Sequence, residues 1–405
     1  MKISAIIAEY NPLHNGHIYH INKTKEITNS DAIICIMSGN YVQRGIPSII
    51  DKWNRAETAL KCGIDLVIEL PVIYSLSSAE FFAFGAVSLL NSLGIVDNIS
   101  FGSEIGDINF ILTVAEVLNN EPIEYKETLK HYLSKGHTYP VSRSKALIDY
   151  FLKNNYDFNH NLEISLSSSN NILAIEYYKS LIRLNSNITP VTIKREGGTY
   201  NSNELNHIFS SATSIRKYIK NNNSLEELKT HLPYASFNLV SKLKKANYPF
   251  VYEEYMLDFL KHKYFTSSES ITKLPDVSEG IHNKIYKALI HSYTYNQLLE
   301  NIKSKRYTYT RINRILCQYY VGFEKFDTEM LRTIPCPYAR VLGFNEVGAK
   351  VLKKAKNNAS IPIYVKLPKK PEETLLLDIQ ATKSYSIINK SINPNSDYII
   401  SPIRS

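Results

Sequence analysis

Cysteine is scarce in this chain of 405 residues, which has four of them. They lie far apart, at Cys35, Cys62, Cys317 and Cys336, and show no pairing pattern. The scarcity excludes the disulfide-rich scaffold that small secreted proteins use. A reduced, cytoplasmic compartment fits this composition best.

Long hydrophobic runs are also missing. The longest candidate, residues 81–96, contains Ser88, Asn91 and Ser92 and is shorter than the roughly 20 residues that a membrane span requires. We therefore expect a buried helix there and no membrane anchor. The first residues run directly into an apolar strand, without the pattern of a cleavable signal. A chain of this length, without repeats, predicts two or three globular domains.

The first two hundred residues alternate apolar runs with helical patterns. Strands are expected at 3–8, 32–37, 66–70, 98–101 and 191–194, with the fourth strand ending at Gly102. This alternation predicts an α/β fold whose N-terminal part is a doubly wound, Rossmann-like parallel sheet with its site above the carboxyl ends of the strands. After about residue 225 the sequence becomes mostly helical and basic, and it ends in a small α/β segment. We therefore expect one domain over residues 1–225 and a second over 226–405.

The strongest local pattern follows the first strand. Asn11 and Pro12 stop that strand, and His14 and His17 then share one face of a new helix. Gly16 lies between them and leaves room for a ligand to approach the backbone. A helix start offers free N–H groups and partial positive charge, and two imidazoles add donors for a polyphosphate. The pattern favours a nucleoside triphosphate site, although paired histidines also occur on ordinary helices and in zinc sites.

Other strand and helix ends carry further candidates. Gly102 could let a base or ribose approach the backbone, or could be a turn glycine. Arg195 follows the fifth strand beside a glycine pair, Gly197 and Gly198, and could neutralise phosphate charge or form a surface ion pair. Arg44, in a polar loop, could bind a carboxylate or phosphate, or be solvated. Asn170 could contact a ligand or cap a helix.

Positive charge exceeds negative charge, and the formal net charge is +9. Residues 302–314 interleave five cations with tyrosines, which suits phosphates and unpaired bases. Residues 347–370 contain seven lysines and no acidic residue. Each tract could instead be a solvated helix face. The candidate RNA contacts are Lys303, Lys305, Arg306, Arg311, Arg314, Lys350, Lys353 and Lys354.

The motifs carry a family resemblance. Residues 14–17 (HNGH) resemble the HxGH signature of the nucleotidyltransferase superfamily. Together with residues 11–13 (NPL), 37–45 (MSGNYVQRG), 51–53 (DKW) and 65–71 (DLVIELP), they are similar to the tRNA(Met) cytidine acetate ligase family of Firmicutes. The resemblance extends over nearly the whole chain. Residues 210–216 (SSATSIR) resemble the second superfamily signature, with Ala212 in place of a hydroxyl residue, and Ser169 replaces the proline of the family's Pro-Asn-Asn-Ile-Leu.

The resemblance implies a HIGH-type nucleotidyltransferase domain at residues 1–225 and a tRNA-binding region at 226–405. It implies that His14 and His17 are catalytic, binding the ATP phosphates and stabilising the transition state at the α-phosphorus. The expected ATP-binding residues are Ile7, Ala8, Glu9, Tyr10, Asn11, Pro12, Leu13, His14, Asn15, Gly16, His17, Ile18, Tyr19, His20, Gly102, Asn170, Arg195, Ser211, Thr213 and Arg216.

The implied reaction is an ATP-dependent ligation. Acetate would be activated as acetyl-adenylate and its acetyl group transferred to N4 of the wobble cytidine of elongator tRNA(Met), giving N4-acetylcytidine, AMP and pyrophosphate. Mg²⁺ is expected to arrive with ATP, with no dedicated metal site and no obligate protein partner. The alternatives are a small-molecule adenylyl- or cytidylyltransferase acting on a phosphorylated metabolite, and a non-catalytic RNA-binding protein.

Overall fold

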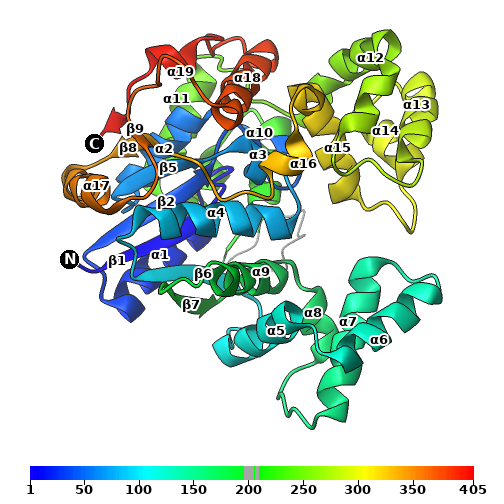
Figure 1. Ribbon diagram of the computed structural model, residues 1–405. Coiled ribbons are helices and arrows are strands. Elements are labelled where there is room, and N and C mark those ends of the chain that lie inside the picture. Colours follow the sequence, from blue (N-terminus) through cyan, green and yellow to red (C-terminus); the bar gives the residue numbers. More distant parts are fainter. Residues whose placement is uncertain (196–204, 206–208) are drawn as a thin grey trace.

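A twisted central sheet organises the computed structural model, which describes residues 1–195, 205 and 209–405 (Figure 1). The sheet has eight strands in the order β10-β8-β5-β2-β1-β6-β7, with β9 beside β8. The strands are β1 (Ile3–Ala8), β2 (Ala32–Ser38), β5 (Leu66–Leu70), β6 (Asn98–Ser103), β7 (Thr189–Lys194), β8 (Ala339–Phe344), β9 (Ile363–Tyr364) and β10 (Ile403–Arg404).

The first five of these strands are parallel, as the sequence predicts. The chain moves from β1 outward to β2 and β5 and then returns to the other side of β1 for β6 and β7. This reversal places the topological switch point between β1 and β6, where doubly wound folds bind ligands. The expected break at Gly102 is wrong, because Gly102 pairs with Ile193 and β6 continues to Ser103.

Helices cover both faces of the sheet. On one face, α1 (Asn15–Thr28) and α2 (Lys52–Lys61) pack on side chains such as Ile33 and Val67. On the other, α4 (Ala79–Leu93) packs on their neighbours Ile34 and Ile68. Burial of alternate side chains on both faces explains the unbroken apolar runs of the strands. The short helix α3 (Val72–Ser75) precedes α4.

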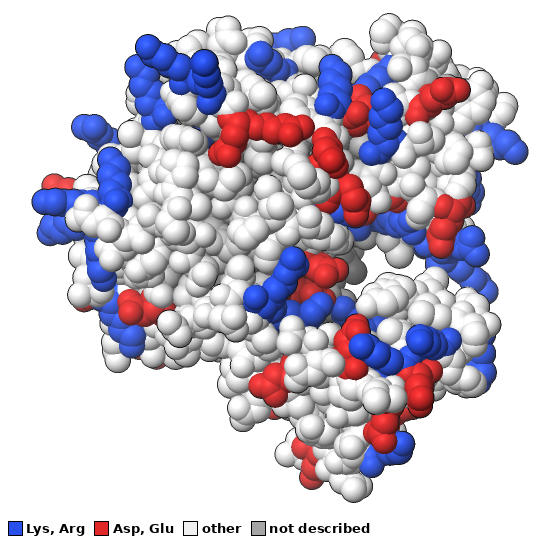
Figure 2. Space-filling view, in the orientation of Figure 1, with Lys and Arg blue, Asp and Glu red and all other residues white. Residues whose placement is uncertain are grey.

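Two groups of helices project from the sheet on the side of the pocket (Figure 1). The lower group contains α5 (Ile108–Asn120), α6 (Ile123–Ser134), α7 (Tyr139–Lys153) and α8 (Leu162–Ser167), and it joins α9 (Ser169–Arg183). The upper group contains α12 (Leu257–Thr266), α13 (Ile281–His291), α14 (Tyr295–Ile302), α15 (Tyr309–Val321) and α16 (Thr328–Leu331). A notch separates the two groups on the molecular surface (Figure 2). Within the described residues, every helix is too short or too polar to span a lipid bilayer.

The central sheet contains strands from both sides of the predicted domain boundary at residue 225. The C-terminal α/β segment does not stand apart, because β8 pairs antiparallel with β5, and β9 and β10 pair with β8. Without β8, the polar backbone of β5 would form an open edge. The remaining α-helices of the described residues are α10 (Ala212–Asn221), α11 (Tyr234–Lys245), α17 (Glu346–Asn358), α18 (Glu373–Ile388) and α19 (Ser396–Ile399).

Candidate functional site

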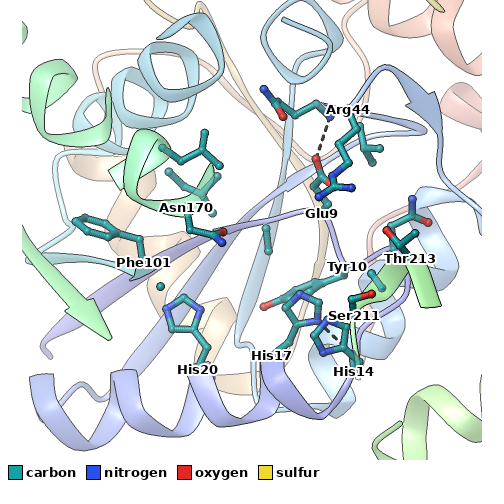
Figure 3. Close-up of a pocket in the computed structure, with 18 of the residues that line it drawn as sticks. Glu9, Tyr10, His14, His17, His20, Arg44, Phe101, Asn170, Ser211 and Thr213 are labelled. Carbon is teal, nitrogen blue, oxygen red and sulfur yellow. Dashed lines mark hydrogen bonds between the residues drawn. The ribbon is translucent and has the colours of Figure 1, made fainter. Parts of the chain in front are cut away.

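A pocket opens at the carboxyl ends of β1 and β6 (Figure 3). Its walls come from β1 and the loop that follows, from α1, β6 and α9, and from the start of α10. Of the predicted ATP-binding residues, those that line it are Ile7, Ala8, Glu9, Tyr10, Asn11, His14, His17, His20, Gly102, Asn170, Arg195, Ser211, Thr213 and Arg216. Residues from five segments of the chain therefore meet where the strand pattern predicts a site.

The other predicted residues do not line this pocket. They are Pro12, Leu13, Asn15, Gly16, Ile18 and Tyr19. Leu13 is buried in the core beneath α1, and Asn15 donates from Nδ2 to the carbonyl of Thr230 at 2.8 Å. A Cβ at residue 16 would lie 3.0 Å from Cε1 of His14. Gly16 thus makes room for the His14 ring and does not itself line the pocket.

His14 and His17 interact through hydrogen bonds and ring stacking at the start of α1. His14 is the N-cap, and its Nδ1 accepts a hydrogen bond from the Gly16 N–H at 3.1 Å. Nδ1 of His17 accepts in turn from the His14 N–H at 3.1 Å, so the two histidines form a capping box. The rings stack with their centroids 3.8 Å apart. Because both Nδ1 atoms accept, each neutral ring carries its proton on Nε2 and can donate from there.

The environment keeps these rings neutral. Burial and the nearby Arg195 and Arg216 lower the pKa of His14 to about 3. Burial, together with His14 and Arg195, holds the pKa of His17 well below its usual value. The same burial and Arg195 lower the pKa of His20 to about 4. A field that disfavours positive charge on the rings favours a bound anion.

The start of α10 is joined directly to the HxGH segment. Ser211 caps α10 by accepting from the Ser214 N–H at 3.1 Å. Arg216 donates from Nη1 to the carbonyl of Asn11 at 2.9 Å and from Nη2 to Oγ1 of Thr213 at 3.1 Å. Two helix N-termini and an arginine therefore face one end of the pocket, an arrangement that binds phosphates.

Arg195 lies across Gly102. The Arg195 N–H donates to the carbonyl of Ser103 at 2.9 Å, and a Cβ at residue 102 would lie 3.2 Å from Cγ of Arg195. Glycine at position 102 therefore lets the arginine side chain pass over the strand. The predicted glycine pair, Gly197 and Gly198, lies outside the described residues.

The opposite end of the pocket is mainly apolar and aromatic. Phe101, Leu173 and Tyr177 line it, and the rings of Phe101 and Tyr177 lie 5.6 Å apart. Asn170 and His20 are the labelled polar side chains beside Phe101 in Figure 3. Asn170 is not the N-cap of α9, because Ser168 holds that position. Aromatic and apolar side chains with a few placed polar groups suit a nucleoside, whereas the His14 end suits its phosphates.

Sequence reasoning missed part of the lining. The missed residues are Val42, Gln43, Ile46, Phe82, Phe101, Leu173, Tyr177 and Ala212; Arg44, for which the sequence favours no single role, also lines the pocket. Four of these belong to a hairpin formed by β3 (Tyr41–Val42) and β4 (Ile46–Pro47), which is fixed to the site because the Gln43 N–H donates to Oε1 of Glu9 at 2.9 Å. The hairpin overlaps the family motif at residues 37–45, and that motif is the sequence signal that could have identified it.

The first basic tract lies on the pocket side. A Cβ at Gly45 would lie 2.2 Å from the backbone nitrogen of Arg314, so α15 packs directly on the pocket hairpin. Lys305 and Arg306 are exposed in the loop before α15. Arg311 is partly engaged with Ser278, at 2.8 Å. The side chain of Arg314 is largely buried beside Asp276, 3.7 Å away.

The second basic tract lies near the amino end of β1. Lys350, Lys353 and Lys354 are exposed on α17. Lys354 donates to the carbonyl of Met1 at 3.4 Å, just before β1 begins. Since the pocket lies where β1 ends, the structure does not bring the two tracts together at one surface. Figure 1 likewise shows α17 and α15 at opposite sides of the molecule.

Comparisons with known proteins agree over the full length. The model of the HIGH Nucleotidyl Transferase family matches residues 1–398. The tRNA(Met) cytidine acetate ligase of Clostridium novyi is 58% identical, covering 100% of this chain and 99% of its own. That of Clostridium kluyveri is 54% identical with the same coverage.

Solved structures give the same result. The apo crystal structure of Thermotoga maritima TmcAL superposes with a TM-score of 0.92 at 34% identity, covering 100% of this chain and 99% of that one. The same protein bound with alpha-thio ATP superposes with a TM-score of 0.89 at the same identity and coverage.

Proposed function

Since the chain belongs to the HIGH nucleotidyl transferase family and groups there with the tRNA(Met) cytidine acetate ligases, we propose that it is an ATP-dependent ligase that acetylates tRNA. Acetate is activated as acetyl-adenylate, and the acetyl group passes to N4 of the wobble cytidine of elongator tRNA(Met). The observation that supports the proposal is the pocket, whose histidine-lined polar end suits phosphates and whose apolar end suits a nucleoside, at the switch point of the sheet. Because its substrates are ATP and tRNA, we expect the reaction to occur in the cytoplasm.

The first step is adenylation of acetate. An acetate oxygen attacks the α-phosphorus, and the bond to the bridging oxygen breaks as pyrophosphate leaves. Negative charge grows on the phosphate oxygens and on the leaving group. The Nε2–H donors of His14 and His17 and the guanidinium of Arg216 face that end of the pocket and stabilise this charge without reorganising.

The second step transfers the acetyl group. N4 of the cytidine attacks the acetyl carbonyl, AMP leaves with the oxygen that joined it to acetate, and the amine loses a proton. A cytidine in an anticodon loop can be unstacked to reach a recessed anhydride, which a paired base cannot do without cost. The exposed Lys305 and Arg306 precede α15, which packs on the pocket hairpin, and this placement supports a role for them in holding that loop.

Magnesium accompanies ATP in this proposal. The described residues contain no group of three His, Cys, Asp or Glu side chains arranged to hold a metal ion. Glu9 is the carboxylate among the residues that line the pocket. This donor set fits an ion carried on the phosphates with most of its waters, and such an ion supplies charge neutralisation.

The direct test measures pyrophosphate release from ATP with acetate, with other small carboxylates, and with a phosphorylated metabolite, each with and without total tRNA. Nucleoside analysis of the tRNA follows. We expect acetate-dependent pyrophosphate and new N4-acetylcytidine. Pyrophosphate only with the metabolite, and unmodified tRNA, would replace this proposal with a small-molecule nucleotidyltransferase. His14→Asn should abolish the signal, whereas His160→Asn, outside the pocket, should retain it.

A further inference from the structure

Glu104, which lies just after β6, accepts hydrogen bonds from the first turn of α9. Its Oε1 accepts from the backbone N–H of Asn170 at 3.2 Å and from the side-chain Nδ2 of Asn170 at 2.7 Å. Its Oε2 accepts from the backbone N–H of Asn171 at 2.9 Å. A hydrogen bond also runs in the other direction, because Oδ1 of Asn171 accepts from the Glu104 N–H at 2.9 Å. The end of β6 and the start of α9 are therefore fixed to each other.

These contacts determine which way the Asn170 amide points. An ionised carboxylate only accepts hydrogen bonds, so Asn170 must turn its NH₂ group toward Glu104. The carbonyl oxygen of the amide then remains to accept a bond from something else. Figure 3 shows the Asn170 amide directed into the pocket from α9, beside Phe101. Without Glu104, the amide could rotate by half a turn and present a donor.

The neighbouring groups identify what this acceptor meets. Phe101, Gly102, Leu173 and Tyr177 line the same end of the pocket, which is apolar and faces away from the phosphate-binding histidines. His20 is engaged there with Oγ of Ser100 at 3.1 Å. A ligand lying with its phosphates at His14 would place its nucleoside against Asn170. A nucleoside of ATP offers two kinds of donor, the adenine amino group and the ribose hydroxyls.

We propose that Glu104 is a positioning residue that fixes Asn170 as a hydrogen-bond acceptor for a donor group of the ATP nucleoside. The inference rests on the proposed function, since it takes ATP to be the ligand. Neither Glu104 nor the orientation of the amide is evident from sequence, because residues 104 and 170 are brought together only by the packing of α9 on β6. A site built to accept a bond discriminates against a nucleotide that lacks the donor.

The experiment measures dissociation constants of the full chain for ATP and three analogues. Purine riboside triphosphate lacks the amino group, and 2′-deoxy-ATP and 3′-deoxy-ATP each lack one hydroxyl. The wild-type protein should prefer ATP by about 3- to 10-fold over the analogue whose donor meets Asn170, as expected for one neutral hydrogen bond. Which analogue is disfavoured identifies the donor.

Asn170→Ala and Glu104→Ala should each abolish that preference and leave the other two ratios unchanged. Asp107→Ala is the matched control, because Asp107 accepts from the backbone N–H groups of Asn109 and Phe110 in the first turn of α5, as Glu104 accepts from those of Asn170 and Asn171 in α9. The control should retain the preference. Equal affinity of the wild type for all four nucleotides, or a preference that survives in Glu104→Ala, would overturn the inference while ATP binding itself stands. Failure of the wild type to bind any of the four would overturn the proposed function as well.

Discussion

The catalytic proposal depends at the residue scale on two hydrogen bonds. The backbone N–H groups of Gly16 and His14 occupy Nδ1 of the two histidines, so that Nε2 of each ring carries the proton. The spacing of the two histidines could be identified from the sequence. Which ring nitrogen carries the proton could not be predicted, because it follows from the capping geometry at the start of α1.

The low pKa of His14 predicts how stability depends on pH. The pKa is about 3 in the folded protein against about 6.5 for an unperturbed histidine. Between these values the unfolded chain binds a proton that the folded chain does not, so this contribution to stability is present above pH 6.5 and lost as the pH falls toward 3.

His14→Asn should therefore reduce the loss of unfolding free energy between pH 7 and pH 5, by up to about 1.4 kcal/mol per pH unit below the unfolded pKa. Urea unfolding at the two pH values measures this difference. An unchanged pH dependence in the variant would mean that His14 titrates normally in the folded protein.

At the scale of elements, the hairpin of β3 and β4 joins the pocket to the helical region. Gly45 has φ of +79° and lies against the backbone of Asn313 and Arg314 in the second turn of α15. A side chain at this position would meet backbone atoms that cannot move aside easily. The hairpin therefore packs against α15 on one side and is hydrogen-bonded on the other to the Glu9 carboxylate, which accepts from the Gln43 N–H.

Gly45→Ala should destabilise the protein by more than about 2 kcal/mol, because left-handed backbone strain adds to overpacking. Gly136→Ala is the control. Gly136 has φ of +82°, but a Cβ there meets nothing within 4 Å, so strain alone should cost about 1 kcal/mol. Denaturant unfolding of both variants compares them, and equal losses would contradict the packing described for the hairpin.

Most strands and helices of the first two hundred residues could be predicted because each carries its own period and ends. The apolar run of β2 and the helix beginning at Asn15 are examples. The short strands β3 and β4, however, lie in a stretch that was expected to be a loop. The pairing of β8 with β5 could not be predicted, because more than two hundred residues separate them and no local pattern selects the partner. The apolar wall of the pocket was missed for the same reason: Phe82 and Tyr177 resemble ordinary core residues until the fold brings them to one cavity.

At the scale of the whole molecule, a buried ion cluster fastens the C-terminal segment to the sheet. Lys52 lies 2.7 Å from Oε1 of Glu69 and 2.9 Å from Oδ1 of Asp397. Arg340 completes the cluster at 3.2 Å from Glu69 and 2.8 Å from Asp397. The four side chains come from α2, β5, β8 and α19, so the cluster ties the last residues of the chain to elements of the first hundred residues.

Asp397→Ala should cost about 3 to 5 kcal/mol, because it leaves two buried cations with one carboxylate. The exposed pair of Lys23 and Glu26, 2.7 Å apart, provides the contrast, and Glu26→Ala should change stability by less than about 1 kcal/mol. Thermal or urea unfolding distinguishes the two, and similar losses would show that the buried cluster contributes little.

The separation of the basic tracts predicts different roles in RNA binding. We expect an isolated anticodon stem-loop that occupies the pocket to reach the loop before α15, whereas α17 lies near the amino end of β1. Replacing Lys305 and Arg306 by alanine should weaken binding of this stem-loop. The slope of log binding constant against log salt concentration should also decrease, by the amount expected for the loss of about two phosphate contacts. Replacing Lys350 and Lys353 should leave both unchanged, and a similar loss in the two double variants would refute this placement.

Transfer of oxygen from acetate to AMP tests the central claim most directly. The full chain is incubated with ATP, tRNA(Met) and acetate labelled with oxygen-18 at both oxygens, and the AMP and pyrophosphate are analysed by mass spectrometry. Attack of acetate on the α-phosphorus predicts one labelled oxygen in each AMP and none in pyrophosphate, and His14→Asn should yield no labelled AMP. N4-acetylcytidine formed with unlabelled AMP would contradict both an acetyl-adenylate intermediate and the activation of acetate in this pocket.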